Sequence, residues 1–257
     1  MRYRPIDQEP EDTRLGRFIP DDWQHVERYP LTALGPAERP KRTPVVIGIN
    51  WYAEFDHPEK DSSGDYFIAK GGPKQLTKVR GGHCVCLEPG GEPDKPAWQT
   101  FYNQGSEGAC VGFGWSRCMS ILNNDRYAAR WLWDQGKLRD QWPETNPGDE
   151  QGTSVRAAAE ALVAEGHVVW ADSYAGDDFR KRAKYTPMLK TGINAFRWAK
   201  SVDEVHSVLG NAQADRLGAV PILNSWGAAY PHRVWLPDAV LERLMSEDGE
   251  IAIPTDR

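Results

Sequence analysis

The feature that most constrains the fold is a glycine-rich turn that leads directly into a helical pattern. Residues 103–113 read Asn-Gln-Gly-Ser-Glu-Gly-Ala-Cys-Val-Gly-Phe. Apolar side chains then recur at i, i+4, i+7, i+8 and i+11, which is the spacing of one helix face: Val111, Trp115, Cys118, Met119 and Leu122. The pattern predicts a half-buried helix that begins near Cys110, so the fold must hold a thiol at a helix N-terminus.

This position gives Cys110 a chemical interpretation. A helix N-terminus offers partial positive charge and free N–H groups, which lower the pKa of a thiol from about 8.5. Gln104, six residues upstream, can place its amide beside the backbone N–H of Cys110. Two such donors suit the oxyanion of an acyl transfer, and each typically lowers the barrier by about 2.7–4 kcal/mol. The alternative is that Cys110 only fills the core of a buried helix, as we expect for Cys118.

Short strands and helices alternate along the rest of the chain. Apolar or β-branched runs bounded by Pro or Gly predict strands at 44–52, 81–87, 97–102 and 219–223. Helical spacing predicts helices at 126–140, from Val155 to a closing Gly166, at 202–209 and at 238–245; Thr153-Ser154 caps the second of these. Residues 1–43 are an irregular lead-in that we expect on the surface, and 171–192 a polar surface excursion. The mixture predicts an α+β protein.

Composition narrows the class of protein. The chain has 257 residues and a formal net charge of -6, which argues against a protein that mainly grips nucleic acid phosphates. No apolar run approaches the roughly 20 residues of a membrane span, and no secretory signal follows the N-terminus, so we expect a soluble cytoplasmic protein. The four cysteines, clustered between positions 84 and 118, indicate a reducing compartment. The histidines outside any motif are expected in surface or cap roles: His25, His57, His167, His206 and His232.

Four motifs together resemble the papain-like cysteine peptidases. The segment from Gln104 to Phe113 resembles the family's active-site turn and helix. Three other segments are similar to its His-bearing strand, its second helix and its Asn-Ser-Trp-Gly strand end: 81–85, 152–159 and 223–227. The arrangement and the residue sequence of the motifs are most similar to those of members encoded by actinobacterial phages. The resemblance implies a two-lobed catalytic domain over 44–257, with β-lobe segments at 44–102 and 211–257 that carry His and Asn, and a helical lobe at about 103–210.

The order of the motifs departs from the family. Members run Cys, then His, then Asn, whereas here His83 precedes Cys110 and Asn224 follows both. Rotating the chain termini does not give this order, so the resemblance implies a transposed, permuted fold. A triad depends on geometry rather than on sequence order, so function is not excluded. Glu107 stands where many members carry a disulfide-forming cysteine, which fits a reducing environment.

The resemblance also implies roles. Cys110 would be the nucleophile, His83 its ion-pair partner and later the acid that protonates the leaving amine. Asn224 would orient the imidazole and Gln104 would complete the oxyanion hole. The residues implied at the substrate-binding surface are Trp226, which would also shield the imidazole–Asn bond from water, Gly82 and Gly108.

Two alternatives remain open for these residues. Adenovirus-protease-like enzymes run His, acid, Gln, Cys, and in that order the residue that orients His83 would be one of Asp94, Glu88 or Asn103. His83 with the cysteines at 84, 86 and 110 could also be imagined as a zinc site. Cys-x-Cys on a strand points alternate residues to opposite faces, however, and there is no Cys-x-x-Cys, so we expect no metal and no cofactor.

These observations favour a phage-encoded cysteine peptidase that forms a thioester acyl-enzyme. Its partner would be a polypeptide substrate or a phage structural protein, in the host cytoplasm or the virion, without nucleic acid or membrane. The alternatives are a catalytically silent scaffold or morphogenesis protein, and an amidase that uses the same triad on a non-protein amide such as a peptidoglycan cross-link.

Overall fold

A computed structural model of the chain describes residues 42–91, 102–142, 152–170 and 190–255. The lead-in up to residue 41, Asp94, residues 97–101 of a predicted strand and most of the predicted 171–192 excursion lie outside these ranges. Within them, no helix combines the length and the apolar character needed to cross a membrane.

One sheet of eight strands organises the described residues. Its strand order is β2-β3-β9-β8-β4-β1-β10-β7, and every pairing is antiparallel except that of β3 with β9. A two-stranded ladder of β5 and β6 lies apart from it. The bounds are β1 Val45–Tyr52, β2 Glu59–Lys60, β3 Tyr66–Phe67, β4 Val79–Leu87, β5 His167–Val168, β6 Lys190–Thr191, β7 Ala195–Trp198, β8 Ala219–Leu223, β9 Val234–Pro237 and β10 Glu250–Thr255.

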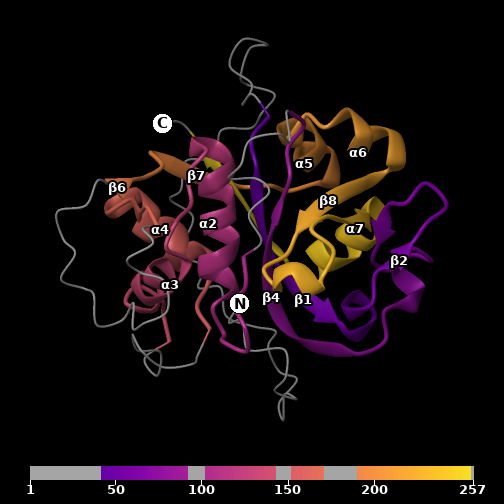
Figure 1. Cartoon of the computed structure of the whole chain (residues 1–257), viewed down its shortest axis with the longest axis horizontal. Helices are drawn as coiled ribbons and strands as arrows, with labels where there is room; N and C mark the ends of the chain where they lie inside the picture. The colour runs from indigo at the N-terminus through magenta and orange to yellow at the C-terminus, as the bar shows by residue number, and fades with distance from the viewer. Residues whose placement is uncertain (1–41, 92–101, 143–151, 171–189, 256–257) are drawn as a thin grey trace.

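Helices cover both faces of this sheet. Figure 1 shows α2, α3 and α4 on one side of β1 and β4, and α5, α6 and α7 on the other. The helices are α2 Cys110–Asn123, α3 Ala129–Lys137, α4 Val155–Ala164, α5 Val202–Leu209, α6 Ala212–Leu217 and α7 Asp238–Ser246, with short 3-10 turns η2 Ala53–Asp56, η3 Pro73–Gln75 and η6 Gly227–Ala229. The predicted α+β class is therefore confirmed.

Strand alternation divides the core into two clusters. On β1, Ile47, Ile49 and Trp51 belong to the cluster that α5 and α7 cover, whereas Val46 belongs to the cluster with α2 and α4. β4 divides in the same way, with Val85 on the first side and Cys84 on the second. From Val45 to Ile49 on β1 and from Gly81 to Leu87 on β4, the strands are thus buried on two faces, and most of their residues there are apolar.

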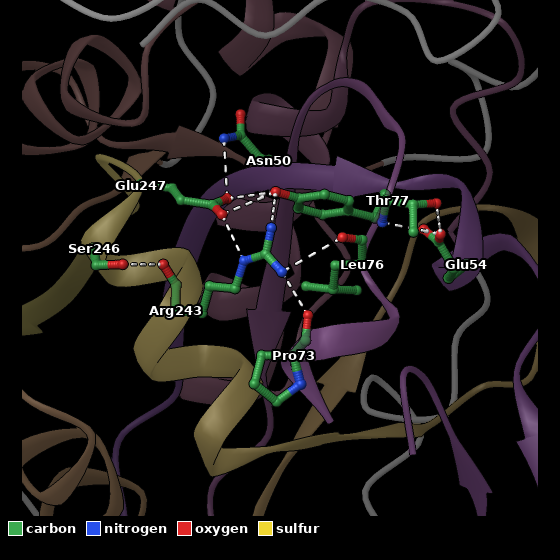
Figure 2. A network of polar contacts seen from close by, with 9 residues as sticks. Asn50, Glu54, Pro73, Leu76, Thr77, Arg243, Ser246 and Glu247 are labelled. Atoms are coloured by element: carbon green, nitrogen blue, oxygen red, sulfur yellow. Dashed lines mark hydrogen bonds and ion pairs between the residues drawn. The ribbon is translucent and has the colours of Figure 1, made fainter. Parts of the chain in front are cut away.

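A polar network fixes the end of β1 against α7. Figure 2 shows the Glu247 carboxylate between Asn50 and Arg243, and Glu247 also accepts a bond of 2.8 Å from the Tyr52 hydroxyl. Arg243 Nε donates to Glu247 over 2.8 Å, and the Arg243 guanidinium reaches the backbone carbonyl of Pro73 in η3. The network therefore holds both neighbours of Trp51.

Several predicted elements match the structure closely. The helices predicted to begin near Cys110 and to span 202–209 are confirmed, and the Ser154 hydroxyl caps α4 by accepting from the Ala157 N–H. The helix predicted at 126–140 is shorter, because Tyr127 forms a bridge with Val169 and Ala128 donates to Val168. Those residues therefore lie before the helix, which begins at Ala129.

The expected surface or cap role is wrong for His167. The residue is fully buried in β5, its ring lies near those of Tyr127 and Trp131, and its Nε2 is 2.7 Å from Ser116 Oγ. Burial lowers the pKa of His167 to about 3, so the ring is neutral. A two-residue strand has no periodicity that reveals which side it buries.

Candidate active site

Cys110 is the first residue of α2. It follows Ala109, which has no side chain able to cap the helix, and the first bond of the turn runs from the Phe113 N–H to the Ala109 carbonyl. Cys110 is only 1% exposed. This burial raises the pKa of its thiol to about 12, although hydrogen bonds from backbone groups of Cys84, Val111 and Cys110 itself act in the opposite direction. Burial here outweighs the helix N-terminus that the sequence indicated.

His83 and Asn224 meet across two neighbouring strands. Register pairs Cys86 of β4 with Leu223 of β8, so that Asn224, just past the end of β8, lies diagonally across from His83 on the same face of the sheet. His83 Nε2 is 2.9 Å from Asn224 Oδ1. Because the amide oxygen only accepts, this contact places a proton on Nε2 and leaves Nδ1 as the basic nitrogen.

Aromatic rings enclose the imidazole. The ring of Trp51 meets His83 edge-on at 4.7 Å between centroids, and Trp226 lies 5.3 Å from it. Burial lowers the pKa of His83 to about 4, while the bond to Asn224 opposes that shift. Trp51 was missed in the sequence, although Ile49, two residues before it on the same face of β1, pairs directly with His83.

The Trp51 ring is itself fixed. Its indole N–H donates to Asp56 Oδ1 over 2.9 Å, and Asp56 forms an ion pair with Arg80. Glu247 also accepts hydrogen bonds from both chain neighbours of Trp51, so polar contacts fix this side of the imidazole.

Gln104 is tied to the strand end that carries Asn224. Its backbone N–H donates to the Ser225 carbonyl over 2.9 Å, and the Ser225 hydroxyl donates to Gln104 Oε1 over 2.6 Å. Gln104 Nε2 donates to the Glu107 carbonyl over 2.9 Å. These bonds fix which way the amide points and leave one hydrogen of Nε2 for another acceptor. Ser225 was also missed, although it lies inside the Asn-Ser-Trp-Gly motif.

The thiol lies beside the strand that bears His83. Cys110 takes a hydrogen bond from the backbone of Cys84, the residue after His83. One turn further along α2, a Cβ on Gly114 would stand 2.8 Å from Cys84 Sγ, so α2 needs glycine there to approach β4 this closely. Three hydrogen bonds therefore connect the segments of the site: Cys84 to Cys110, His83 to Asn224, and Ser225 to Gln104. The residues within each segment are neighbours along the chain.

The other residues predicted for this site are distributed around it. Gly82 and Gly108 are buried, and Trp226 is half-buried, with its neighbour Asn103 forming a backbone bridge to it. Of the alternative orienting residues, Glu88 forms an ion pair with Arg233, and Asn103 Oδ1 accepts from the Gly105 N–H. Asp94 lies outside the described residues. The contact made by His83 is with Asn224.

The part of the chain that the structure describes contains no group of three or more His, Cys, Asp or Glu side chains that could bind a metal ion. The four cysteines are buried thiols. The donor and acceptor groups at the site are instead those of acyl transfer: a thiol, an imidazole with a free nitrogen, and amide N–H groups.

Comparisons with known proteins give structural neighbours only. No protein-family profile matches the chain, and no curated protein matches it. A ragweed pollen allergen that is a cysteine protease, in its proform, matches with a TM-score of 0.46 and 12% identity over 62% of each chain, so this chain spans less than two thirds of that one. A Carica candamarcensis cysteine protease in complex with E-64 matches with a TM-score of 0.45 and 12% identity, over 63% of this chain and 96% of that one. A structure from work on the mite allergens Blo t 1 and Der p 1 gives 0.45 and 13%, over 61% and 67%.

Proposed function

We propose that the chain is a cysteine peptidase that hydrolyses peptide bonds through a thioester acyl-enzyme. Two observations carry the proposal: the 2.9 Å contact between His83 Nε2 and Asn224 Oδ1, and the hydrogen bond to Cys110 from the backbone of Cys84, the residue after His83. The contact with Asn224 leaves Nδ1 of the imidazole free to take a proton from a thiol.

The proposed reaction uses only groups of the chain and one water molecule. His83 Nδ1 accepts the proton of Cys110 Sγ as the sulfur attacks the carbonyl carbon of the peptide. The oxyanion receives hydrogen bonds from the Cys110 backbone N–H and from the second hydrogen of Gln104 Nε2. The C–N bond then breaks, and the imidazolium gives its proton to the leaving amine, which leaves a thioester on Cys110.

Hydrolysis of the thioester restores the enzyme. His83 takes a proton from water as the water oxygen attacks the thioester carbon, the C–S bond breaks, and the proton returns to sulfur. Because burial favours the neutral thiol and the neutral imidazole, we propose that proton transfer accompanies the attack rather than preceding it as a resting ion pair. No cofactor is required.

The test is cleavage of a mixed peptide library, followed by mass spectrometry of new termini. We expect cleavage by the wild-type chain and by Cys118→Ala, which removes another fully buried thiol of the same helix. Cys110→Ala should abolish cleavage. Equal cleavage by Cys110→Ala would exclude the proposal. Because the motifs resemble those of phage-encoded members, phage structural proteins are the first natural substrates to test.

A silent scaffold is the second candidate, favoured by the near-complete burial of Cys110 and His83. In that case the gene would be needed for phage assembly while Cys110→Ala left assembly unchanged. If non-protein amides such as peptidoglycan cross-links were cleaved and peptides were not, the same triad would belong to an amidase.

A further inference from the structure

The turn that carries Gln104 is tied to helix α3 by an ion pair. Glu107 Oε2 lies 2.5 Å from Arg130 Nε, with the two side chains 25% and 37% exposed respectively. The backbone carbonyl of the same Glu107 accepts the bond from Gln104 Nε2. One residue therefore joins the carboxamide of Gln104 to a neighbouring helix.

Arg130 also contacts the helix that carries Cys110. Its guanidinium carbon lies 5.4 Å from the ring centroid of Phe113, which is within cation–π range. Phe113 belongs to the first turn of α2, where its N–H donates to Ala109. Arg130 thus touches both segments whose relative position sets the spacing between Gln104 Nε2 and the Cys110 N–H.

The ion pair between Glu107 and Arg130 can affect the reaction rate much more than it affects folding stability. Partly exposed ion pairs contribute little to the free energy of folding, because water screens the charges. A displacement of about 1 Å at a reacting centre can cost on the order of 100-fold in rate. An ion pair in this position can therefore change catalysis strongly while changing the melting temperature little.

We infer that Glu107 and Arg130 are positioning residues for the oxyanion site formed by Gln104 and Cys110. The inference rests on the proposed peptidase function. The carboxylate holds the residue whose carbonyl orients the Gln104 amide, and the guanidinium keeps that residue at a fixed place beside the first turn of α2.

The experiment compares steady-state kinetics of charge-neutral variants on a peptide that the wild type cleaves. Glu107→Gln keeps the shape and the backbone carbonyl, and we expect kcat to fall about tenfold with little change in KM, the pattern of a lost transition-state interaction. Arg130→Met should behave alike. The matched control is Arg139→Gln, which removes another partly exposed ion pair, between Arg139 and Glu165, and should leave kcat unchanged.

A double-mutant cycle distinguishes positioning from general destabilisation. In a Gln104→Ala background, Glu107→Gln should have no further effect on kcat, because the amide that it positions is gone. Alkylation of Cys110 by iodoacetamide forms no oxyanion, so its rate should be the same in Glu107→Gln and in the wild type. The charge-reversed pair Glu107→Arg with Arg130→Glu should recover part of the lost kcat.

Three outcomes would overturn the inference. It fails if Glu107→Gln keeps kcat within about twofold of the wild type, or if it costs the same factor with and without Gln104, which is what additive, uncoupled sites give. It also fails if alkylation slows as much as turnover does. A wild-type chain that cleaves no amide would instead refute the proposed function, and this inference with it.

Discussion

The amide oxygen of Asn224 decides which nitrogen of His83 carries the proton. We expect Asn224→Ala to lower kcat on the order of 100-fold, because the imidazole can then rotate and present the wrong tautomer to the thiol. The measurement is kcat on a peptide substrate. Asn103→Ala is the control, since Asn103 Oδ1 accepts from the Gly105 N–H. A large loss in Asn103→Ala with none in Asn224→Ala would favour Asn103 as the orienting residue.

Other residues at the site differ in how far the sequence reveals them. Four of the site residues lie in local sequence motifs and could be predicted from residue type and spacing: Cys110, His83, Gln104 and Asn224. Trp51 and Arg130 act through packing against distant segments, and no local pattern marks them. The sequence did not predict that the buried Cys110 thiol is neutral either, because burial depends on the whole fold.

At the scale of elements, His206 joins three helices. From α5, its Nδ1 lies 2.8 Å from Asp215 of α6 and its Nε2 lies 2.8 Å from Asp238 of α7. Both nitrogens can donate only in the charged ring. Burial lowers the pKa of His206, but the two carboxylates outweigh burial, and the net pKa is raised.

The raised pKa predicts a pH-dependent stability. A folded-state pKa above the ordinary value of about 6.5 gives a contribution that is fully present below that pH and is lost as pH rises through the folded-state pKa. The melting temperature of the wild type should therefore exceed that of His206→Gln most at about pH 5.5, and the difference should shrink toward about pH 9. A difference that stays constant across this range would show that the contacts do not depend on charge.

Elements with strong periodicity, clear caps or a continuous apolar run were predictable, including the five-residue β8 at 219–223. The helices α2, α4 and α5 follow apolar spacing, and Ser154 and Ser201 cap α4 and α5. In contrast, β7, β9, β10 and α6 have four to six residues each and were not predicted. The unpredicted strands have shorter apolar runs and pair with partners far along the chain, as β10 pairs with β1.

At the scale of the whole molecule, the order of the elements brings the site together across long separations. The strand with His83 precedes helix α2, and the strand end with Asn224 lies more than 100 residues after it. The mixed α+β class was predictable from the elements. The division into two lobes stays a prediction. The helix α5, expected in the helical lobe, packs its apolar residues into the same core cluster as those of α7.

The most direct measurement of the central claim is intact-mass spectrometry after rapid quenching with an activated peptide ester. We predict a mass increase equal to the acyl group, located on Cys110, which decays by hydrolysis, is absent in Cys110→Ala and forms far more slowly in His83→Ala. No adduct on Cys110, or an adduct formed equally fast without His83, would contradict a thiol–imidazole active site.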